Sequence, residues 1–168
     1  MKPVVTIRRF PDPIRKRSTH PLERVDDGVR KFLEQMTTTM CVHPRCVGLA
    51  APQVGSSLRV AVMDSSRNPK VTESCGLIIL VNPRVIAAEG TVLQREGCLS
   101  IPDFTGNVQR AARVQVQAHD QDGRLQEFWL EGFEAIIAQH EIDHLDGKLF
   151  LDRVANLTTD VFRRKTYR

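Results

Sequence analysis

The segment from Phe133 to Gly147 constrains this chain more than any other. It contains His140-Glu141-Ile142-Asp143-His144, the pattern H-E-x-x-H, and it has no proline. Gly147 stands just past its end, which is typical of a helix C-terminus. Residues four apart on a helix lie on one face, about 5–6 Å apart at Cβ. Both histidines can therefore reach one metal ion, with Glu141 placed to exchange a proton with a water on that metal.

The alternative is a surface helix whose polar residues match the pattern by chance, because short motifs carry a real false-positive risk. The positions of the histidines argue against it. Phe133 and Ile137 lie on the same helix face as the two histidines, at successive spacings of four, three and four. Histidines that continue an apolar, inward face need partners, and a shared metal supplies them. We therefore interpret the segment as a metal-binding helix.

Length and composition indicate one soluble domain. A chain of 168 residues fits a single unit, residues 1–168, with its own core. No run approaches the roughly 18 apolar residues that cross a bilayer, and no secretory signal follows the basic N-terminus. The cysteines are Cys41, Cys46, Cys75 and Cys98. A chain of this length without an export signal does not need disulfides, so we expect free or metal-bound thiols in the cytoplasm and no membrane partner.

The other patterns predict an α+β fold of mainly antiparallel short strands around a central H-E-x-x-H helix. Asp26 or Asp27 can cap an earlier helix with the apolar face Val29, Phe32, Leu33, Met36 and Met40. Pro83 predicts a turn, Asp122-Gly123 predicts a hairpin, and the tail is expected to form a last helix. Strands are predicted at 58–63, 77–81, 85–88, around Val92, at 113–118 and at 125–130.

Two histidines leave a catalytic metal one protein ligand short. Downstream, Asp146 and Asp152 are available, but Asp146 is nearly adjacent to His144 and poorly placed to ligate as well. Upstream, Cys98 lies in the sequence Glu-Gly-Cys-Leu-Ser, where Gly97 lets the backbone fold closely around a metal. An isolated cysteine is more usually a small buried hydrophobe. From the residues alone, both interpretations of Cys98 stay open.

Three stretches, in this order, resemble the motifs of the peptide deformylases. They are Gly48-Leu49-Ala50-Ala51-Pro52-Gln53, Glu96-Gly97-Cys98-Leu99-Ser100 and Gln139-His140-Glu141-Ile142-Asp143-His144. The resemblance extends over nearly the whole chain, including Pro11-Asp12-Pro13 and Asp122-Gly123. Each motif alone is moderately specific, whereas three in this order at family-like separations are a strong signal.

The resemblance implies that Cys98, His140 and His144 bind a metal, with water in the fourth position. The family is known for working best with ferrous iron. We therefore expect Fe²⁺ natively, with Zn²⁺, Ni²⁺ or Co²⁺ able to substitute.

The resemblance also implies the reaction and its residues. Glu141 would be the general acid and base, while the Gln53 side-chain amide and the Leu99 backbone N–H would hold the developing oxyanion. The implied activity is hydrolysis of the N-formyl group from the N-terminal methionine of newly made polypeptides, with release of formate.

A methionine substrate needs an apolar pocket beside the metal. Phe133 and Ile137 are the candidates, and the resemblance places Val47 opposite them; plain core packing is the alternative for these side chains. Val47 and Gly48 would offer backbone hydrogen bonds to the peptide, as if it were an added strand. We also expect Glu96 to take part in substrate binding.

One position departs from the family pattern. Cys46 stands where the first motif usually has a glycine, and we expect a side chain there to affect substrate preference more than the reaction. Cys41, His43 and Cys46 also form a C-x-H-x-x-C cluster, but the matching second half of a zinc module is missing.

Two rival functions are considered. One is another H-E-x-x-H zinc hydrolase, which would need a third ligand other than Cys98. The other is a deformylase-like fold that only binds chain ends or ribosomal RNA. The net charge of +4 is concentrated at both chain ends, for which solvated termini are the ordinary explanation. We hypothesise that the segment around Arg163 to Arg168 gives weak ribosome association; DNA is not an expected partner.

Overall fold

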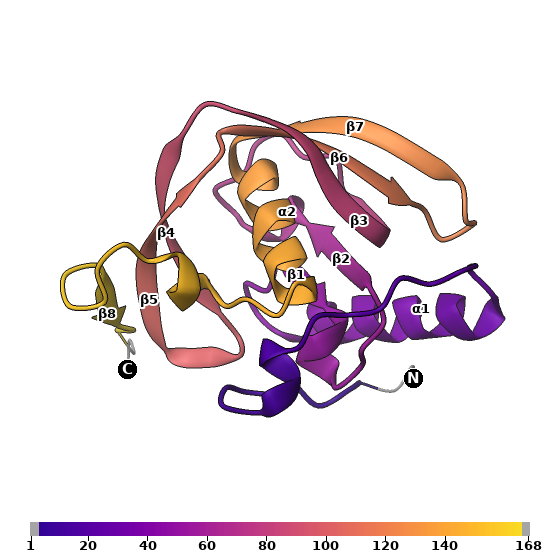
Figure 1. Cartoon of the computed structure of the whole chain (residues 1–168), viewed down its shortest axis with the longest axis horizontal. Helices are drawn as coiled ribbons and strands as arrows, with labels where there is room; N and C mark the ends of the chain where they lie inside the picture. The colour runs from indigo at the N-terminus through magenta and orange to yellow at the C-terminus, as the bar shows by residue number, and fades with distance from the viewer. Residues whose placement is uncertain (1–3, 166–168) are drawn as a thin grey trace.

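Two antiparallel sheets lie on either side of one central helix in the computed structural model, which describes residues 4–165 (Figure 1). The helices are α1 (Asp27–Val42) and α2 (Gly132–Leu145). The short 3₁₀ helices are η1 (Pro13–Lys16), η2 (Ala51–Val54), η3 (Ser65–Arg67) and η4 (Phe150–Arg153). The strands are β1 (Gly48–Ala50), β2 (Val60–Asp64), β3 (Leu77–Glu89), β4 (Val92–Cys98), β5 (Ile101–Arg110), β6 (Arg113–His119), β7 (Leu125–Glu131) and β8 (Val161–Arg163).

The larger sheet has the order β1-β2-β3-β6-β7 and the smaller has the order β4-β5-β8. Every pairing between these named strands is antiparallel. The α+β prediction is therefore confirmed, including the β6–β7 hairpin, whose turn contains Gly123 at a φ of +80°. Strands β1 and β4 are each an edge of their sheet, so each has one side without a strand partner.

Helix α2 carries the H-E-x-x-H motif against the larger sheet. Its small residues Ala135 and Ala138 are fully buried and pack with β2, β3 and β6. The helix ends at Leu145, and Gly147 follows with a φ of +73°, as the sequence predicts. A Cβ at Gly147 would lie 2.8 Å from the backbone oxygen of Lys16. The N-terminal segment is thereby held against the C-terminal end of α2.

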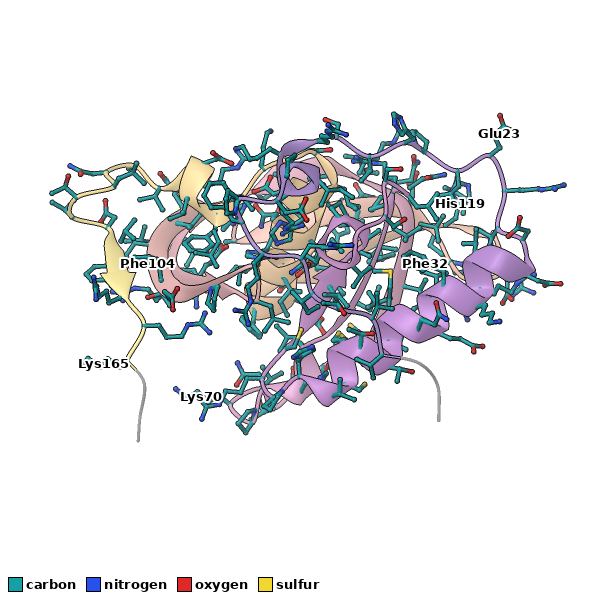
Figure 2. All side chains as sticks on the ribbon, turned by 90° about the horizontal axis from the view of Figure 1, so that it is seen from below. Glu23, Phe32, Lys70, Phe104, His119 and Lys165 are labelled. Carbon is teal, nitrogen blue, oxygen red and sulfur yellow. The ribbon has the colours of Figure 1, made fainter. Side chains whose placement is uncertain are left out.

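Helix α1 covers the other face of the larger sheet. The Asp26 side chain accepts a hydrogen bond of 2.9 Å from the Val29 backbone N–H, which confirms the predicted cap. Successive residues of β2 alternate between the two helices: Ala61 packs in the core with α2, whereas Val60 packs in the core with α1. Phe32 projects from α1 toward the body of the molecule (Figure 2).

Three sequence predictions are corrected. Pro83 does not end a strand, because β3 continues past it with a register shift between Val81 and Arg84 and Asn82 at a φ of +51°. This irregularity accommodates a residue that has no N–H to donate. The tail forms η4 and strand β8 in place of a last α-helix. Strand β5 has no counterpart among the predicted strands. Within residues 4–165, no helix is long and apolar enough to span a membrane.

Candidate active site

Cys98, at the end of β4, lies against the two histidines of α2. The Nε2 atoms of His140 and His144 are 3.0 Å apart, and Cys98 Sγ is 3.3 Å from His144 Nε2. The three ligand atoms lie within 4.8 Å of one another, and within residues 4–165 no other group of His, Cys, Asp and Glu converges in this way. The Cys41, His43 and Cys46 cluster is therefore not assembled. One thiol and two imidazoles on a common centre fit a divalent transition metal.

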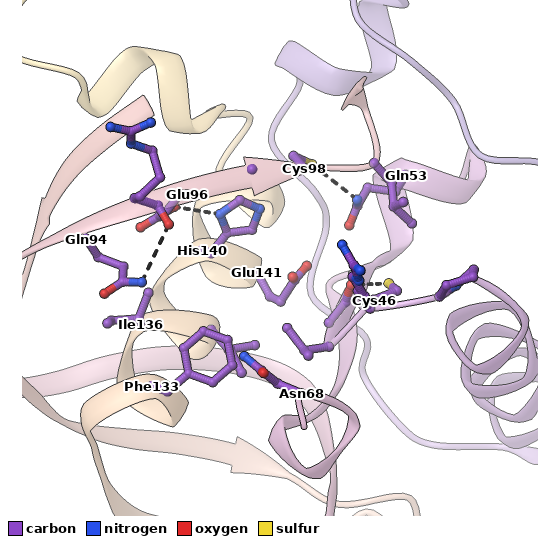
Figure 3. A pocket seen from close by; sticks show the side chains of 18 of the residues that line it. Cys46, Gln53, Asn68, Gln94, Glu96, Cys98, Phe133, Ile136, His140 and Glu141 are labelled. Carbon is purple, nitrogen blue, oxygen red and sulfur yellow. Dashed lines mark hydrogen bonds and ion pairs between the residues drawn. The ribbon is translucent and has the colours of Figure 1, made fainter. Parts of the chain in front are cut away.

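The His140 ring is oriented by a contact at Nδ1, the nitrogen that faces away from Cys98 and His144. His140 Nδ1 is 2.8 Å from Oε2 of Glu96 (Figure 3). Arg110 donates to both oxygens of Glu96, at 2.6 and 2.9 Å. Burial opposes ionisation of Glu96, but the hydrogen bonds from Arg110 and His140 lower its pKa to about 2. A carboxylate fixed in this way directs His140 Nε2 toward Cys98 and His144.

Arg110 extends this network beneath α2. It donates to Asp143 Oδ2 at 2.6 Å, and Arg153 donates to both Asp143 oxygens at 3.0 and 2.7 Å. Burial alone would raise the pKa of Asp143, but the hydrogen bonds from Arg153 and Arg110 lower this pKa below its usual value. Strands β4 and β5, helix α2 and η4 are therefore joined by charge-assisted hydrogen bonds directly behind the histidines.

His144 is contacted by a residue from the opposite end of the chain. Arg15 is fully buried, and its Nη2 atom is 3.0 Å from His144 Nδ1. Burial lowers the pKa of Arg15, while the charges of Cys98 and Glu141 act in the opposite direction. Arg15, Arg110 and Arg153 were not identified from the sequence, because nothing in their local patterns marks them. Asp143 was named only as part of the third motif, without a role.

Cys98 and His140 are electrostatically coupled. Burial opposes thiolate formation, but the hydrogen bond and charge of His140 and the charge of Arg15 hold the pKa of Cys98 below its usual value. The pKa of His140 is raised well above its usual value, because its hydrogen bonds to Cys98 and Glu96 outweigh burial. The site therefore favours a thiolate, which is the form that binds metal.

Glu141 lies beside this cluster with its side chain directed into the cavity (Figure 3). It is 4% exposed, and Oε2 has no hydrogen-bond partner among residues 4–165. Burial raises the pKa of Glu141 to about 7, although the charges of His140 and Arg15 oppose the rise. A Cβ at Gly48 would lie 2.9 Å from Glu141 Cγ and Cδ. Glycine at position 48 therefore leaves room for the carboxylate.

Gln53 approaches from the opposite side of the cavity. Its Oε1 atom accepts a hydrogen bond of 2.8 Å from the Ala50 backbone N–H, and its Nε2 atom is 3.5 Å from Cys98 Sγ (Figure 3). Leu99 follows Cys98 in the turn between β4 and β5 and lines the same cavity. The amide donor of Gln53 is thus oriented toward the ligand cluster by a backbone contact.

These residues border one cleft of about 390 Å³ between the two edge strands, β1 and β4. The cleft also brings together the predicted substrate-binding residues Val47, Gly48, Glu96, Phe133 and Ile137. Both oxygens of Glu96 are already engaged by Arg110 and His140. Its predicted role in substrate binding stays a prediction, and its contacts support a role in orienting His140.

A profile described as polypeptide deformylase matches residues 4–160. The chain belongs to the polypeptide deformylase family. The peptide deformylase of Syntrophobacter fumaroxidans is 41% identical over 162 residues, which cover 96% of this chain and 93% of that protein. The peptide deformylase of Mesorhizobium japonicum is 42% identical over 166 residues, covering 98% and 90%.

Solved structures agree with the family assignment. A crystal structure of a peptide deformylase from Legionella pneumophila superimposes with a TM-score of 0.83 at 38% identity, covering 92% of this chain and 88% of that one. The peptide deformylase from Thermotoga maritima gives a TM-score of 0.83 at 36% identity, covering 92% and 99%. Family membership places the chain among metal-dependent hydrolases that remove the N-formyl group from nascent peptides.

Cys46 occupies the first-motif position where the deformylase pattern usually has glycine. It borders the cleft, but it is only 6% exposed and packs in the core beneath α1 with residues such as Met36 and Leu49. Its Sγ donates a hydrogen bond of 3.1 Å to the Gly48 backbone oxygen. Burial raises the pKa of Cys46 to about 12. The thiol is therefore held in the core.

Proposed function

We propose that residues 1–168 form a single catalytic domain that removes the N-formyl group from the N-terminal formylmethionine of newly made polypeptides and releases formate. The convergence of Cys98, His140 and His144 beside the buried carboxylate of Glu141 carries this proposal. The cleft beside them provides access for a peptide end between two edge strands.

The three convergent residues would hold one divalent metal through Cys98 Sγ and the Nε2 atoms of His140 and His144. We propose Fe²⁺ as the native ion, with Zn²⁺, Ni²⁺ or Co²⁺ as substitutes; the mixed thiolate and imidazole donor set suits all four. When bound, such an ion supplies a Lewis acid that polarises a carbonyl and lowers the pKa of water from 15.7 to about 7.

Glu141 would act as general base and then as general acid. Its carboxylate takes a proton from the attacking water and delivers it to the nitrogen of the leaving amine. The residue lies in a water-poor setting, because it is buried and is flanked by Gly48. A single carboxylate can serve both steps, since the second step returns it to the ionised form in which the first step began.

Gln53 and Leu99 would stabilise the oxyanion that develops on the formyl oxygen. The Gln53 Nε2 donor is already oriented toward Cys98, because Oε1 is anchored on Ala50. The Leu99 backbone N–H would supply the second donor. Preorganised donors of this type need no rearrangement when the charge forms.

The substrate would bind as an added strand at the edge of β1. Backbone groups of Val47 and Gly48 would pair with the peptide, and Phe133 and Ile137 would contact the methionine side chain. Glu96 would support this arrangement by holding His140. Phe133 and Ile137 lie on the same helix, α2, as the proposed ligands His140 and His144, which fixes their separation.

The partner of the reaction is a nascent formylated polypeptide, so we propose a cytoplasmic location. We also propose weak association with the ribosome through the basic C-terminal segment. Arg163, Arg164 and Lys165 are exposed in the structure, whereas Arg168 lies outside the described residues. Deletion of the segment should weaken ribosome co-sedimentation at low salt; unchanged co-sedimentation would remove this part of the proposal.

The deciding experiment is anaerobic purification, a metal count per chain and a formate-release assay on a formyl-methionyl peptide. We expect one metal per chain and turnover that is lost in Glu141→Gln, which keeps the size of the side chain and all three ligands. A full metal site without formate release would overturn the proposal and favour a binding function. Retention of metal and activity by Cys98→Ala would favour a zinc hydrolase with a different third ligand.

A further inference from the structure

Arg164, immediately after β8, reaches into the wall of the cleft. Its backbone N–H donates to the Asp103 oxygen at 2.8 Å, which fixes the segment beside β5. Its guanidinium lies over Gly97 of β4: a Cβ built on Gly97 would be 3.4 Å from Arg164 Cζ and closer still to Nη2. Arg164 also lines the cleft that contains Glu141. The C-terminal segment thus contributes a cation to the cleft.

The guanidinium of Arg164 has no hydrogen-bond or ion-pair partner among residues 4–165. The carboxylates that line the cleft are Glu96 and Glu141. Both oxygens of Glu96 are engaged by Arg110 and His140, and Glu141 is buried at the ligand cluster. Neither neutralises Arg164, so its five donors remain available to a ligand.

Other cations extend the charge along the cleft. Arg45 lines it as well and also has no partner for its side chain in the described part of the chain. The Arg95 guanidinium lies 3.6 Å from the centroid of the Phe162 ring, a cation–π contact. Phe162 and Arg164 are two residues apart and so lie toward the same face of the small sheet. Two arginines, Arg95 on β4 and Arg164 after β8, therefore both line the cleft.

We propose that Arg164 is a specificity residue that binds a carboxylate side chain in one of the two residues after the formylmethionine. This inference rests on the proposed deformylase function. An extended peptide advances about 3.3 Å per residue. If it pairs with β1, its residues after the methionine face the other wall of the cleft, which β4 and Arg164 line. The planar guanidinium over Gly97 matches a carboxylate with two parallel hydrogen bonds.

The test compares kcat/KM for two matched pairs of amidated peptides, formyl-Met-Asp-Ser against formyl-Met-Asn-Ser and formyl-Met-Ala-Asp against formyl-Met-Ala-Asn. Amidation removes the terminal carboxylate as a competing anion. At low salt we expect the wild type to favour the acidic member of at least one pair by about two- to fivefold, the range of a solvent-accessible ion pair. High salt should reduce this preference.

Arg164→Gln should abolish the preference, so that the acidic and the neutral member of each pair give equal kcat/KM. Arg163→Gln is the matched control, because it removes the same charge from the adjacent position on the opposite side of β8. Loss of the preference in both variants would show a general charge effect and overturn the assignment to Arg164, as would a wild type without any preference. If the wild type does not deformylate even the neutral peptides, the proposed function itself fails.

Discussion

Arg15 Nη2 lies 3.0 Å from His144 Nδ1, although the two residues are 129 positions apart in the chain. The arginine is fully buried, and its Nε and Nη1 atoms have no partner among residues 4–165. The Thr19 backbone N–H donates to the Leu145 oxygen at 2.8 Å and holds this segment on α2. The N-terminal segment therefore places a positive charge beside His144, one of the three residues that could hold a metal ion.

Replacement of Arg15 should weaken metal binding. Arg15→Met removes the charge that stabilises the Cys98 thiolate and the contact that restrains the His144 ring. Loss of a residue that supports metal ligands typically costs about 10- to 100-fold in affinity. We expect a loss in this range for Zn²⁺, measured at neutral pH by competition with a chromogenic chelator. Arg17→Met, which removes an exposed charge two residues away, should leave the affinity unchanged.

Gln53→Ala should lower kcat while metal content is preserved. The side chain offers its Nε2 donor toward the ligand cluster, and loss of one oxyanion donor typically costs about 10²–10³ in kcat. The Ala50 backbone N–H also loses its acceptor, so the free energy of unfolding should fall by about 1 kcal/mol. Steady-state kinetics measures the change in kcat, and thermal unfolding measures the change in stability. A higher KM with unchanged kcat would assign Gln53 to substrate binding instead.

The extent to which the sequence predicted this molecule depends on the range of the interactions. The α1 cap at Asp26 and the glycine that follows α2, Gly147, are predicted from local chemistry, and the structure confirms both. Cys98, on β4, reaches the histidines of α2 only through tertiary packing, so the sequence around it left its role open. Pro83 was assigned to a turn because a register shift inside a strand has no local signature.

The surroundings of the ligands were harder still to foresee. A histidine ligand usually needs a carboxylate or carbonyl at its second nitrogen, and that rule could have suggested Glu96, which precedes Cys98 by one strand repeat. No comparable rule points to Arg15 or Arg110, because their partners are brought to them by tertiary packing. Arg164 belonged to a basic tail in the sequence, and only the position of β8 places it at the cleft.

Glu96 should make the metal-free protein sensitive to acid. Its pKa is about 2 in the folded protein against an ordinary value of 4.5, so the unfolded chain binds the proton more readily. The stabilisation is complete above pH 4.5 and is lost as the pH falls through 2, with a total on the order of 3 kcal/mol. Urea unfolding between these pH values should show a steeper decline for the wild type than for Glu96→Gln. Parallel declines would show that Glu96 is not the group responsible.

Cys46 should be inert to alkylation and should have little influence on substrate choice. With a pKa raised to about 12 by burial, only about one thiol in ten thousand is ionised at pH 8. Iodoacetamide should therefore label the exposed Cys41 and Cys75 first, as peptide mass spectrometry would reveal.

Cys46→Ala leaves a small void in the core beneath α1, so a loss of about 1 kcal/mol in stability is expected. Relative kcat/KM values across a set of formylated peptides should stay within about twofold, because the thiol is buried in the core and is hydrogen-bonded to the Gly48 oxygen. A larger change in that ranking would mean that residue 46 shapes the substrate site after all.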